Sequence, residues 1–331
     1  MKNETIRVFV ITYKRAALLK RALNSLINQT YTNWVAEVIN DDPLDTEVNE
    51  LLRELADERI ALKDHPTNFG ATRNFNYCFS KKTDEPYASI LEDDNWWEED
   101  FLDKMVAAIN GHLNAQMVVS NEKIWIEQND GKWLDANRTV WDKKTGTELL
   151  EFNLRDKCGS AKICNSAMLW RTSCSNSWLT PNDLPVDVTE HFRERVIPHP
   201  ILLVNKPLVN FSQTIATARS QNPSLWGSYQ VLLVASAFRK IHGIERSKLA
   251  YDLFLKARKD SNSPYKTTLL HAALADKSAR AIFYMATLPE ILRYLLTWLK
   301  KPITSYTTIN AVHNNKEHFH YLININPNKG C

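Results

Sequence analysis

The first 120 residues alternate short apolar runs with amphipathic segments, and this alternation constrains the fold more than any other feature. The apolar runs are short enough to be buried strands, and the segments between them carry apolar residues at helical spacing, as at Leu19, Leu23 and Leu26. Strand and helix alternating in this way predict a doubly wound, mostly parallel α/β sheet with right-handed crossovers. The predicted strands cover residues 7–12, 34–39, 59–63, 87–91 and 117–120.

Three consecutive acids, Glu92, Asp93 and Asp94, follow the apolar run 87–91 directly. Open α/β sheets bind their ligands at the carboxyl ends of the strands, where these acids are predicted to lie. Their mutual repulsion would be relieved by a divalent cation that prefers oxygen ligands, such as Mn²⁺ or Mg²⁺. Solvated loop acids, with Asp94 capping the next helix, are the alternative explanation.

A second acidic cluster, containing Asp41, follows the predicted strand 34–39. The acids after these two strands are therefore expected to converge on one crevice. Arg73 falls in the first turn of the helix after Gly70, where a cation is poorly placed relative to the helix dipole. This position indicates either that an anion or acid pairs with the Arg73 side chain, or that Arg73 is a surface residue without a partner.

Composition excludes several classes of function. The net charge is only +3 and the basic residues are scattered, which argues against nucleic acid as a partner. No two of the eight glycines lie closer than Gly146 and Gly159, so neither a dinucleotide fingerprint nor a Walker A loop occurs. The five cysteines lack paired spacing, and no signal-like leader follows Met1, so we expect a reduced, cytoplasmic protein.

The residues after 215 predict a mainly helical region, which suggests a division into domains 1–215 and 216–331. The segment 281–299 is apolar, but Pro289, Glu290 and Arg293 make it a poor membrane span. Its end, with Trp298 and two lysines, suits a peripheral position on the cytoplasmic face of a membrane. Packing on the catalytic domain or on a second copy is the alternative. The predicted helices are 224–242, 246–259, 266–285 and 290–299.

Several short motifs resemble, in order and spacing, those of the family 2 glycosyltransferases, which have the GT-A fold. The resemblance is firm over residues 5–110 and looser over 160–215. It depends on residues 8–15, 29–31, 38–42, 68–74 and 91–95.

The resemblance implies roles for individual residues around a nucleotide-diphosphate sugar. Asn40 stands where the family usually has an acid. By position, Thr12 and Tyr13 would line the base and ribose, Asp41 would accept a hydrogen bond from the ring N–H of uracil or thymine, Arg73 would lie near the nucleotide, Asp93 would face the ribose or a metal, and Asp94 would bind the metal on the diphosphate.

The activity implied by the resemblance is metal-dependent, inverting transfer of a sugar from a UDP-sugar or related donor. The acceptor would be a hydroxyl of a glycan or lipid-linked saccharide, as in polysaccharide biosynthesis. Asp187, at a helix start after the acceptor-side strand 162–171, is the expected general base. Glu190 and Asp183 compete for this role, and helix capping would also explain Asp187.

Acceptor specificity is expected from three parts of the chain: the Trp96–Trp97 pair, a hairpin that turns at Asn129-Asp130-Gly131, and the C-terminal half. A nucleotidyltransferase and a non-catalytic module that binds sugar nucleotides or glycans are the alternative functions.

Overall fold

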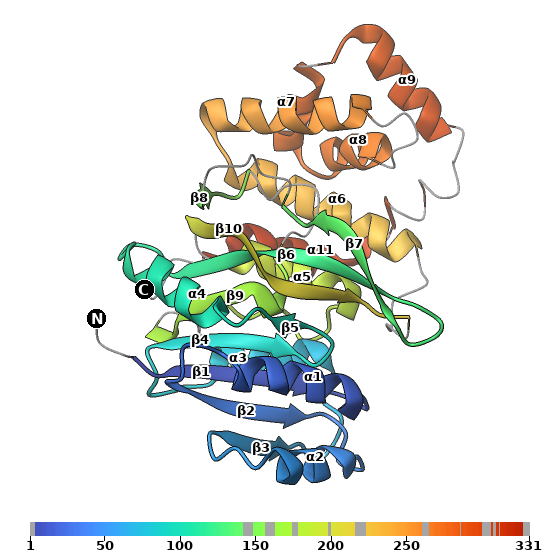
Figure 1. Cartoon of the computed structure of the whole chain (residues 1–331). Helices are drawn as coiled ribbons and strands as arrows, with labels where there is room; N and C mark the ends of the chain where they lie inside the picture. The colour runs from blue at the N-terminus through green and yellow to red at the C-terminus, as the bar shows by residue number, and fades with distance from the viewer. Residues whose placement is uncertain are drawn as a thin grey trace.

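The computed structural model describes residues 4–141, 148–155, 163–173, 178–197, 200–215, 223–259, 265–284, 286–299, 306, 309–310 and 312–326. A single mixed sheet with helices on both faces forms the N-terminal part, and further helices lie beyond one end of it (Figure 1). The strands are β1 Ile6–Thr12, β2 Trp34–Asn40, β3 Ile60–Asp64, β4 Tyr87–Glu92, β5 Trp96–Trp97, β6 Met117–Glu127, β7 Trp133–Thr139, β8 Leu149–Phe152, β9 Met168–Arg171 and β10 Ile201–Gln213. The helices are α1 Ala16–Ile27, α2 Glu47–Leu55, α3 Ala71–Ser80, α4 Phe101–Asn110, α5 Val186–Val196, α6 Pro223–Lys240, α7 Gly243–Lys259, α8 Tyr265–Ala275, α9 Leu288–Leu299 and α11 Lys316–Asn324, with short 3₁₀ segments η1 Asn165–Ala167 and η3 Lys277–Tyr284.

The strand order is β3-β2-β1-β4-β9-β6-β10-β5, with β7 paired to β6 and β8 to β10. β1 lies between β2 and β4 and is parallel to both. The predicted GT-A architecture, a mostly parallel doubly wound sheet, is therefore confirmed. β9 is antiparallel to both of its neighbours, β4 and β6, and so separates them. Of the expected acceptor-side strand 162–171, residues 168–171 form β9, and the alternating pattern did not predict its insertion between β4 and β6.

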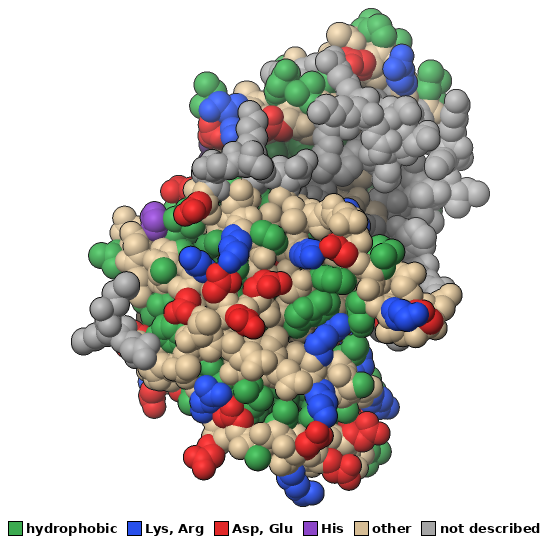
Figure 2. All heavy atoms as spheres, in the orientation of Figure 1, with side chains coloured by type: hydrophobic (Ala, Val, Ile, Leu, Met, Phe, Trp, Pro, Cys, Tyr) green, Lys and Arg blue, Asp and Glu red, His purple; other side chains and the backbone are tan. Residues whose placement is uncertain are grey.

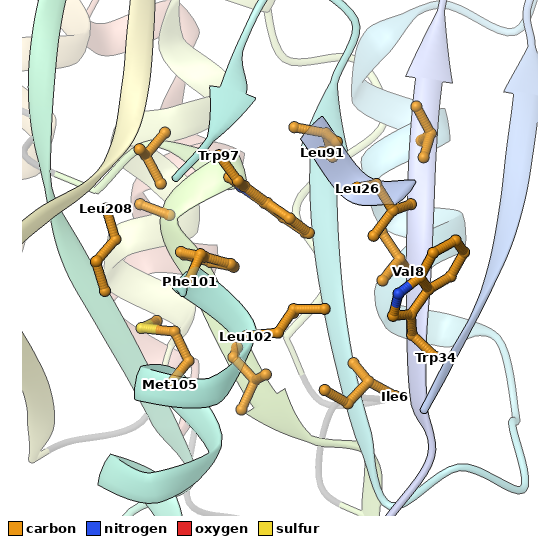
Figure 3. Packing of buried hydrophobic residues seen from close by; sticks show 14 of the residues in the cluster. Ile6, Val8, Leu26, Trp34, Leu91, Trp97, Phe101, Leu102, Met105 and Leu208 are labelled. Atoms are coloured by element: carbon orange, nitrogen blue, oxygen red, sulfur yellow. The ribbon is translucent and has the colours of Figure 1, made fainter. Parts of the chain in front are cut away.

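Two apolar layers hold the helices on the sheet. On one face, α1, α2 and α4 pack against the strands, and Trp97 stacks on Phe101 with ring centroids 4.2 Å apart (Figure 3). On the other face, Phe75 and Phe79 of α3 pack against β9 and the segment that follows it. Burying each such side chain stabilises the fold by about 1.5–3 kcal/mol.

The C-terminal helices form a further apolar cluster around Phe238 and Phe254. A smaller cluster containing Phe192 and Leu322 joins them to α5. The predicted helix 266–285 is broken at Asp276, whose Oδ1 accepts a 2.7 Å hydrogen bond from the Ser278 N–H and so starts η3. The division at residue 215 stays a prediction.

The short helix α11 was not predicted because its sequence buries only two side chains, His318 and Leu322. His318 Nδ1 lies 2.9 Å from the Tyr229 hydroxyl of α6, and its Nε2 lies 3.1 Å from Asp183. These tertiary contacts stabilise a helix that is too short to be stable alone.

One face of α9 is apolar and exposed; it consists of Leu288, Leu292, Leu295, Leu296 and Leu299. Among the described residues, no helix has the length and apolarity needed to cross a bilayer. The side chain of Trp298 and the two lysines after α9 lie outside the described part of the chain. The expected contact with a membrane surface or a second copy stays a prediction.

Candidate active site

The carboxyl ends of β1, β2 and β4 bring the predicted site residues to one edge of the sheet. The backbone N–H of Asp41 donates to the Thr12 carbonyl at 3.0 Å, and that of Asp93 donates to the Ile11 carbonyl at 3.1 Å. The acids that follow β2 and β4 therefore lie on either side of the end of β1. This confirms that the acids converge at one edge of the sheet, while the expected crevice stays a prediction.

Asp93 ties the end of β1 to the end of β4. Its buried Oδ2 accepts hydrogen bonds from the Thr12 hydroxyl at 2.9 Å and from the Tyr13 N–H at 3.3 Å. Burial raises the pKa of Asp93 to about 7, although the Arg15 charge and these hydrogen bonds act to lower it. Thr12 is buried with its hydroxyl engaged in this way, whereas the Tyr13 ring is 42% exposed and faces solvent at the edge of the site.

Asp94 is the more accessible member of the pair. Arg15 Nη1 lies 2.8 Å from Asp94 Oδ2, and Arg15 Nε lies 3.5 Å from Asp93 Oδ2. Burial alone would lower the pKa of Arg15, but the charges of Asp93 and Asp94 outweigh it and raise that pKa. The N-cap position of α4 is occupied by Asp100, so the alternative in which Asp94 caps this helix is wrong.

Asp41 organises the start of α3. Its Oδ1 accepts a 2.7 Å hydrogen bond from the Phe69 N–H, and its Oδ2 accepts a 2.9 Å bond from the Gly70 N–H. Gly70 has φ of 79°, a left-handed conformation that glycine adopts at little cost. Each carboxylate oxygen keeps a second lone pair for a ligand. The carboxylate itself is buried, and its contact with a base stays a prediction.

Arg73 lies in the first turn of α3, close in sequence to the loop that Asp41 binds, and its side chain is exposed. Within the described ranges it makes no ion pair. The acidic protein partner expected for Arg73 is therefore not found among these residues. An anionic ligand or solvent is left as the partner of its side chain.

The first turn of α5 packs against the first turn of α3, where the Thr72 and Thr189 hydroxyl oxygens lie 2.9 Å apart. Pro185 occupies the N-cap position of α5, so Asp187 is not the capping residue. The Asp187 side chain lies outside the described part of the structure, and its catalytic role stays a prediction. Asp183 has a largely exposed side chain and pairs with His318 of α11.

Glu190, one turn further along α5, lies within the electrostatic field of the acidic triplet. Burial raises its pKa to about 8, and the charges of Glu92, Glu194 and Asp94 contribute in the same direction. Its predicted competition with Asp187 as general base stays a prediction.

A buried acidic cluster behind the site was missed by sequence reasoning. Glu122 accepts a 3.2 Å hydrogen bond from the Cys164 N–H, and Glu194 accepts a 2.9 Å bond from the Ile163 N–H. Glu92 accepts a 2.9 Å bond from the Ser166 hydroxyl. Burial raises the pKa values of Glu122 and Glu92. Glu122 and Glu194 are single acids inside a strand and a helix and form no motif, so only their three-dimensional proximity to Glu92 of the triplet reveals this cluster.

The Trp96–Trp97 pair is divided between two environments. Trp97 is 3% exposed and belongs to the apolar core, so its predicted part in acceptor specificity is wrong. Trp96 points away from that core and contacts Trp125 and Trp133 of the hairpin. The predicted hairpin itself is confirmed, with Gly131 at φ of 78° in its turn.

Comparison with known proteins agrees with this arrangement. The model of Glycosyl transferase family 2 matches residues 7–172. An uncharacterized glycosyltransferase of Haemophilus influenzae is 29% identical over 117 residues, which cover 33% of this chain and 35% of that protein. An uncharacterized glycosyltransferase, R139, of Acanthamoeba polyphaga mimivirus is 28% identical over 113 residues, covering 29% of this chain and 46% of that protein. The chain therefore matches less than half the length of either relative.

Among solved structures, TarS 1–349 of S. aureus in complex with UDP has a TM-score of 0.60 at 13% identity. That alignment covers 96% of this chain and 91% of TarS 1–349. The same protein in complex with UDP-GlcNAc also gives a TM-score of 0.60, at 14% identity and with 96% and 92% covered. At this identity the likeness shows the fold alone. Because the family model covers half of the chain and includes Asp41, Asp93 and Asp94, the protein belongs to the family 2 glycosyltransferases.

Proposed function

We propose that this glycosyltransferase moves a sugar from a nucleoside-diphosphate donor, preferably a UDP-sugar, to a hydroxyl of a saccharide acceptor with inversion at the anomeric carbon. The observation that carries the proposal is the convergence of Asp41, Asp93 and Asp94 around the end of β1. The fold shared with a protein solved in complex with UDP supports the choice of nucleotide.

Mn²⁺ or Mg²⁺ is the proposed cofactor, and the donor set fits such an ion. Asp94 Oδ2 already holds a cationic group, and its Oδ1 makes no hydrogen bond to a described residue. Within the described ranges, no three His, Cys, Asp or Glu side chains are grouped to hold a metal. Mg²⁺ bound through one or two carboxylates commonly takes its remaining ligands from water and substrate phosphates. Asp94, with Asp93 behind it, would hold the ion, which would neutralise charge on the leaving diphosphate.

The protein residues divide the remaining tasks. Tyr13 and Asp41 would bind the nucleoside, and Arg73 and Arg15 are cations at the edge of the site that suit the diphosphate. An acid of α5 would take the proton from the attacking hydroxyl. Asp187 is the proposed base by position, and Glu190 is the neighbour that could replace it.

The proposal is tested by measuring release of the nucleoside diphosphate from a panel of nucleotide sugars with Mn²⁺ and with EDTA. We expect release from UDP-sugars with Mn²⁺ only, faster when saccharides are added, and an inverted anomeric configuration in the product. Equal release in EDTA would contradict the role of the metal. Donor binding without release or transfer from any nucleotide sugar would instead support a non-catalytic binding module.

A further inference from the structure

Three tryptophans from separate strands meet beside the acidic triplet. Trp96 of β5 lies 5.4 Å from Trp125 of β6 and 6.1 Å from Trp133 of β7, measured between ring centroids. Register explains the grouping, because Trp96 pairs with Asn210 of β10, and Asn210 is aligned with Lys123 of β6. All three indoles are partly exposed. We refer to Trp96, Trp125 and Trp133 as the tryptophan platform.

Arg21 of α1 connects the tryptophan platform to the proposed metal ligand. Its guanidinium carbon lies 3.9 Å from the Trp96 ring and 4.3 Å from the Trp133 ring. Its Nη2 donates a 2.6 Å hydrogen bond to the Asp94 carbonyl. Burial lowers the pKa of Arg21 to about 10, which still leaves it charged at neutral pH. The platform therefore lies next to the residue whose carboxylate would face the donor diphosphate.

An open cavity of about 660 Å³ continues from the tryptophan platform along the hairpin. Lys123 marks the junction, because it lines the cavity and its Nζ lies 4.8 Å from the centre of the Trp125 ring. Figure 2 shows hydrophobic side chains over β6 and β10 with charged side chains of both signs beside them. The cavity is lined by Lys123, Asp135, Asn137, Arg138, Thr139 and Pro207.

The chemistry of this surface selects among ligands. Lys123 is paired with Asp135 at 3.0 Å, so the lining offers donors and acceptors without a dense positive charge. Nucleic acid and anionic lipid would favour an uncompensated basic surface. A saccharide has apolar C–H faces that stack on indole rings, and hydroxyls that bond to the amide, carboxylate and ammonium groups of such a cavity.

We propose that the tryptophan platform and the adjoining cavity bind an oligosaccharide acceptor, whose terminal sugar contacts the exposed parts of the indoles beside Arg21 and next to Asp94. This inference rests on the proposed sugar transfer. The acceptor would be an extended glycan rather than a single small alcohol, because the platform and the cavity together extend from Trp96 across β6 into the hairpin. Trp125 is held in place by a 2.7 Å hydrogen bond from its Nε1 to Asn210 Oδ1.

The test uses the full chain, fluorescently labelled and incubated with UDP and Mn²⁺, on an array of immobilised neutral and anionic oligosaccharides. We expect the wild type to bind a distinct group of saccharides, and Trp125→Ala and Trp133→Ala to weaken that binding at least tenfold. Trp133→Phe keeps an aromatic ring and should retain part of the saccharide binding. It distinguishes loss of the aromatic surface from misfolding of Trp133→Ala.

Two matched controls should bind the array like the wild type. Leu134→Ala removes an exposed side chain next to Trp133 on the opposite face of β7. Arg59→Ala removes a guanidinium stacked 3.7 Å over Trp34 at the distant edge of the sheet.

A thermal-shift titration with UDP and Mn²⁺ on each variant reports separately on donor binding. Absence of that shift in the wild type would count against the proposed function. Two results would overturn the acceptor site alone when the thermal shift is normal. The first is that the wild type does not bind the array, and the second is that Trp125→Ala and Trp133→Ala bind it as well as the wild type does.

Discussion

Arg15 Nη1 lies 2.8 Å from Asp94 Oδ2, so a guanidinium pairs with the carboxylate that we assign to a divalent cation. The two cations compete for this carboxylate unless Arg15 moves. The Arg15 side chain is 37% exposed, which leaves it free to turn toward the donor phosphates when the metal binds.

Arg15→Ala should therefore bind Mn²⁺ more tightly than the wild type when no nucleotide is present. The expected gain is about two- to fivefold, since a partly exposed ion pair contributes about 0.5–1 kcal/mol. Electron paramagnetic resonance of free Mn²⁺ during a titration measures this directly. Equal or weaker binding would show that Arg15 does not compete with the metal.

Asp41 should give the site its preference for a pyrimidine. UDP and TDP present their ring N–H to its carboxylate where the purines of GDP and ADP would present a different edge, so UDP and TDP should stabilise the protein against heat more than GDP or ADP. Asp41→Asn should reduce this preference. It should also lower the free energy of unfolding by about 1–3 kcal/mol, because the Phe69 and Gly70 N–H groups lose a charged acceptor. A wild-type preference for GDP would refute the assignment.

Asp187→Asn should separate chemistry from donor binding. A general base removes the acceptor proton and adds little to donor binding, so Mn²⁺-dependent UDP binding should stay near the wild-type value while transfer falls about 10²- to 10⁴-fold. Glu190→Gln is the matched comparison on the same helix. Near-normal transfer by Asp187→Asn, with the large loss in Glu190→Gln, would move the role to Glu190.

Glu190 should also make stability depend on pH. Its folded pKa of about 8 lies above the usual glutamate value, so the folded state retains a proton that the unfolded state has lost. The free energy of unfolding should therefore fall as pH rises from about 5 to 8, by at most about 1.4 kcal/mol per pH unit for this group. The free energy of unfolding, measured with urea at several pH values in that range, should depend less on pH in Glu190→Gln than in the wild type. The same pH dependence in both proteins would contradict the raised pKa.

The sequence predicted the parts of the fold that depend on local sequence patterns. Apolar runs of strand length between amphipathic helices predicted the order from β1 to β4 and the position of Asp93 and Asp94 at a strand end. The hairpin was predicted because glycine and asparagine mark its turn. These features depend on residues close together in the chain.

Features that depend on distant residues were not predictable. β9 enters between β4 and β6 through pairing over long sequence separations, and α11 is stable only because it docks on α5 and α6. The ion pair of Arg15 with Asp94 and the buried acids around Cys164 likewise arise from tertiary proximity. Trp97 was misassigned because adjacent residues in a strand point to opposite faces, and the sequence does not show which face is the core.

The central claim, that Asp94 holds the cation on the donor diphosphate, is tested most directly by thermal shift with UDP in the presence and absence of Mn²⁺. In the wild type, Mn²⁺ should strengthen UDP stabilisation, which approaches about 2.7 kcal/mol at a ligand concentration a hundred times its Kd. Asp57→Asn is the matched control, because Asp57 is also largely buried and paired with an arginine, at 2.6 Å, away from the site. We predict that Asp94→Asn folds but loses the Mn²⁺-dependent part of the shift while Asp57→Asn keeps it, and an undiminished shift in Asp94→Asn would contradict the account.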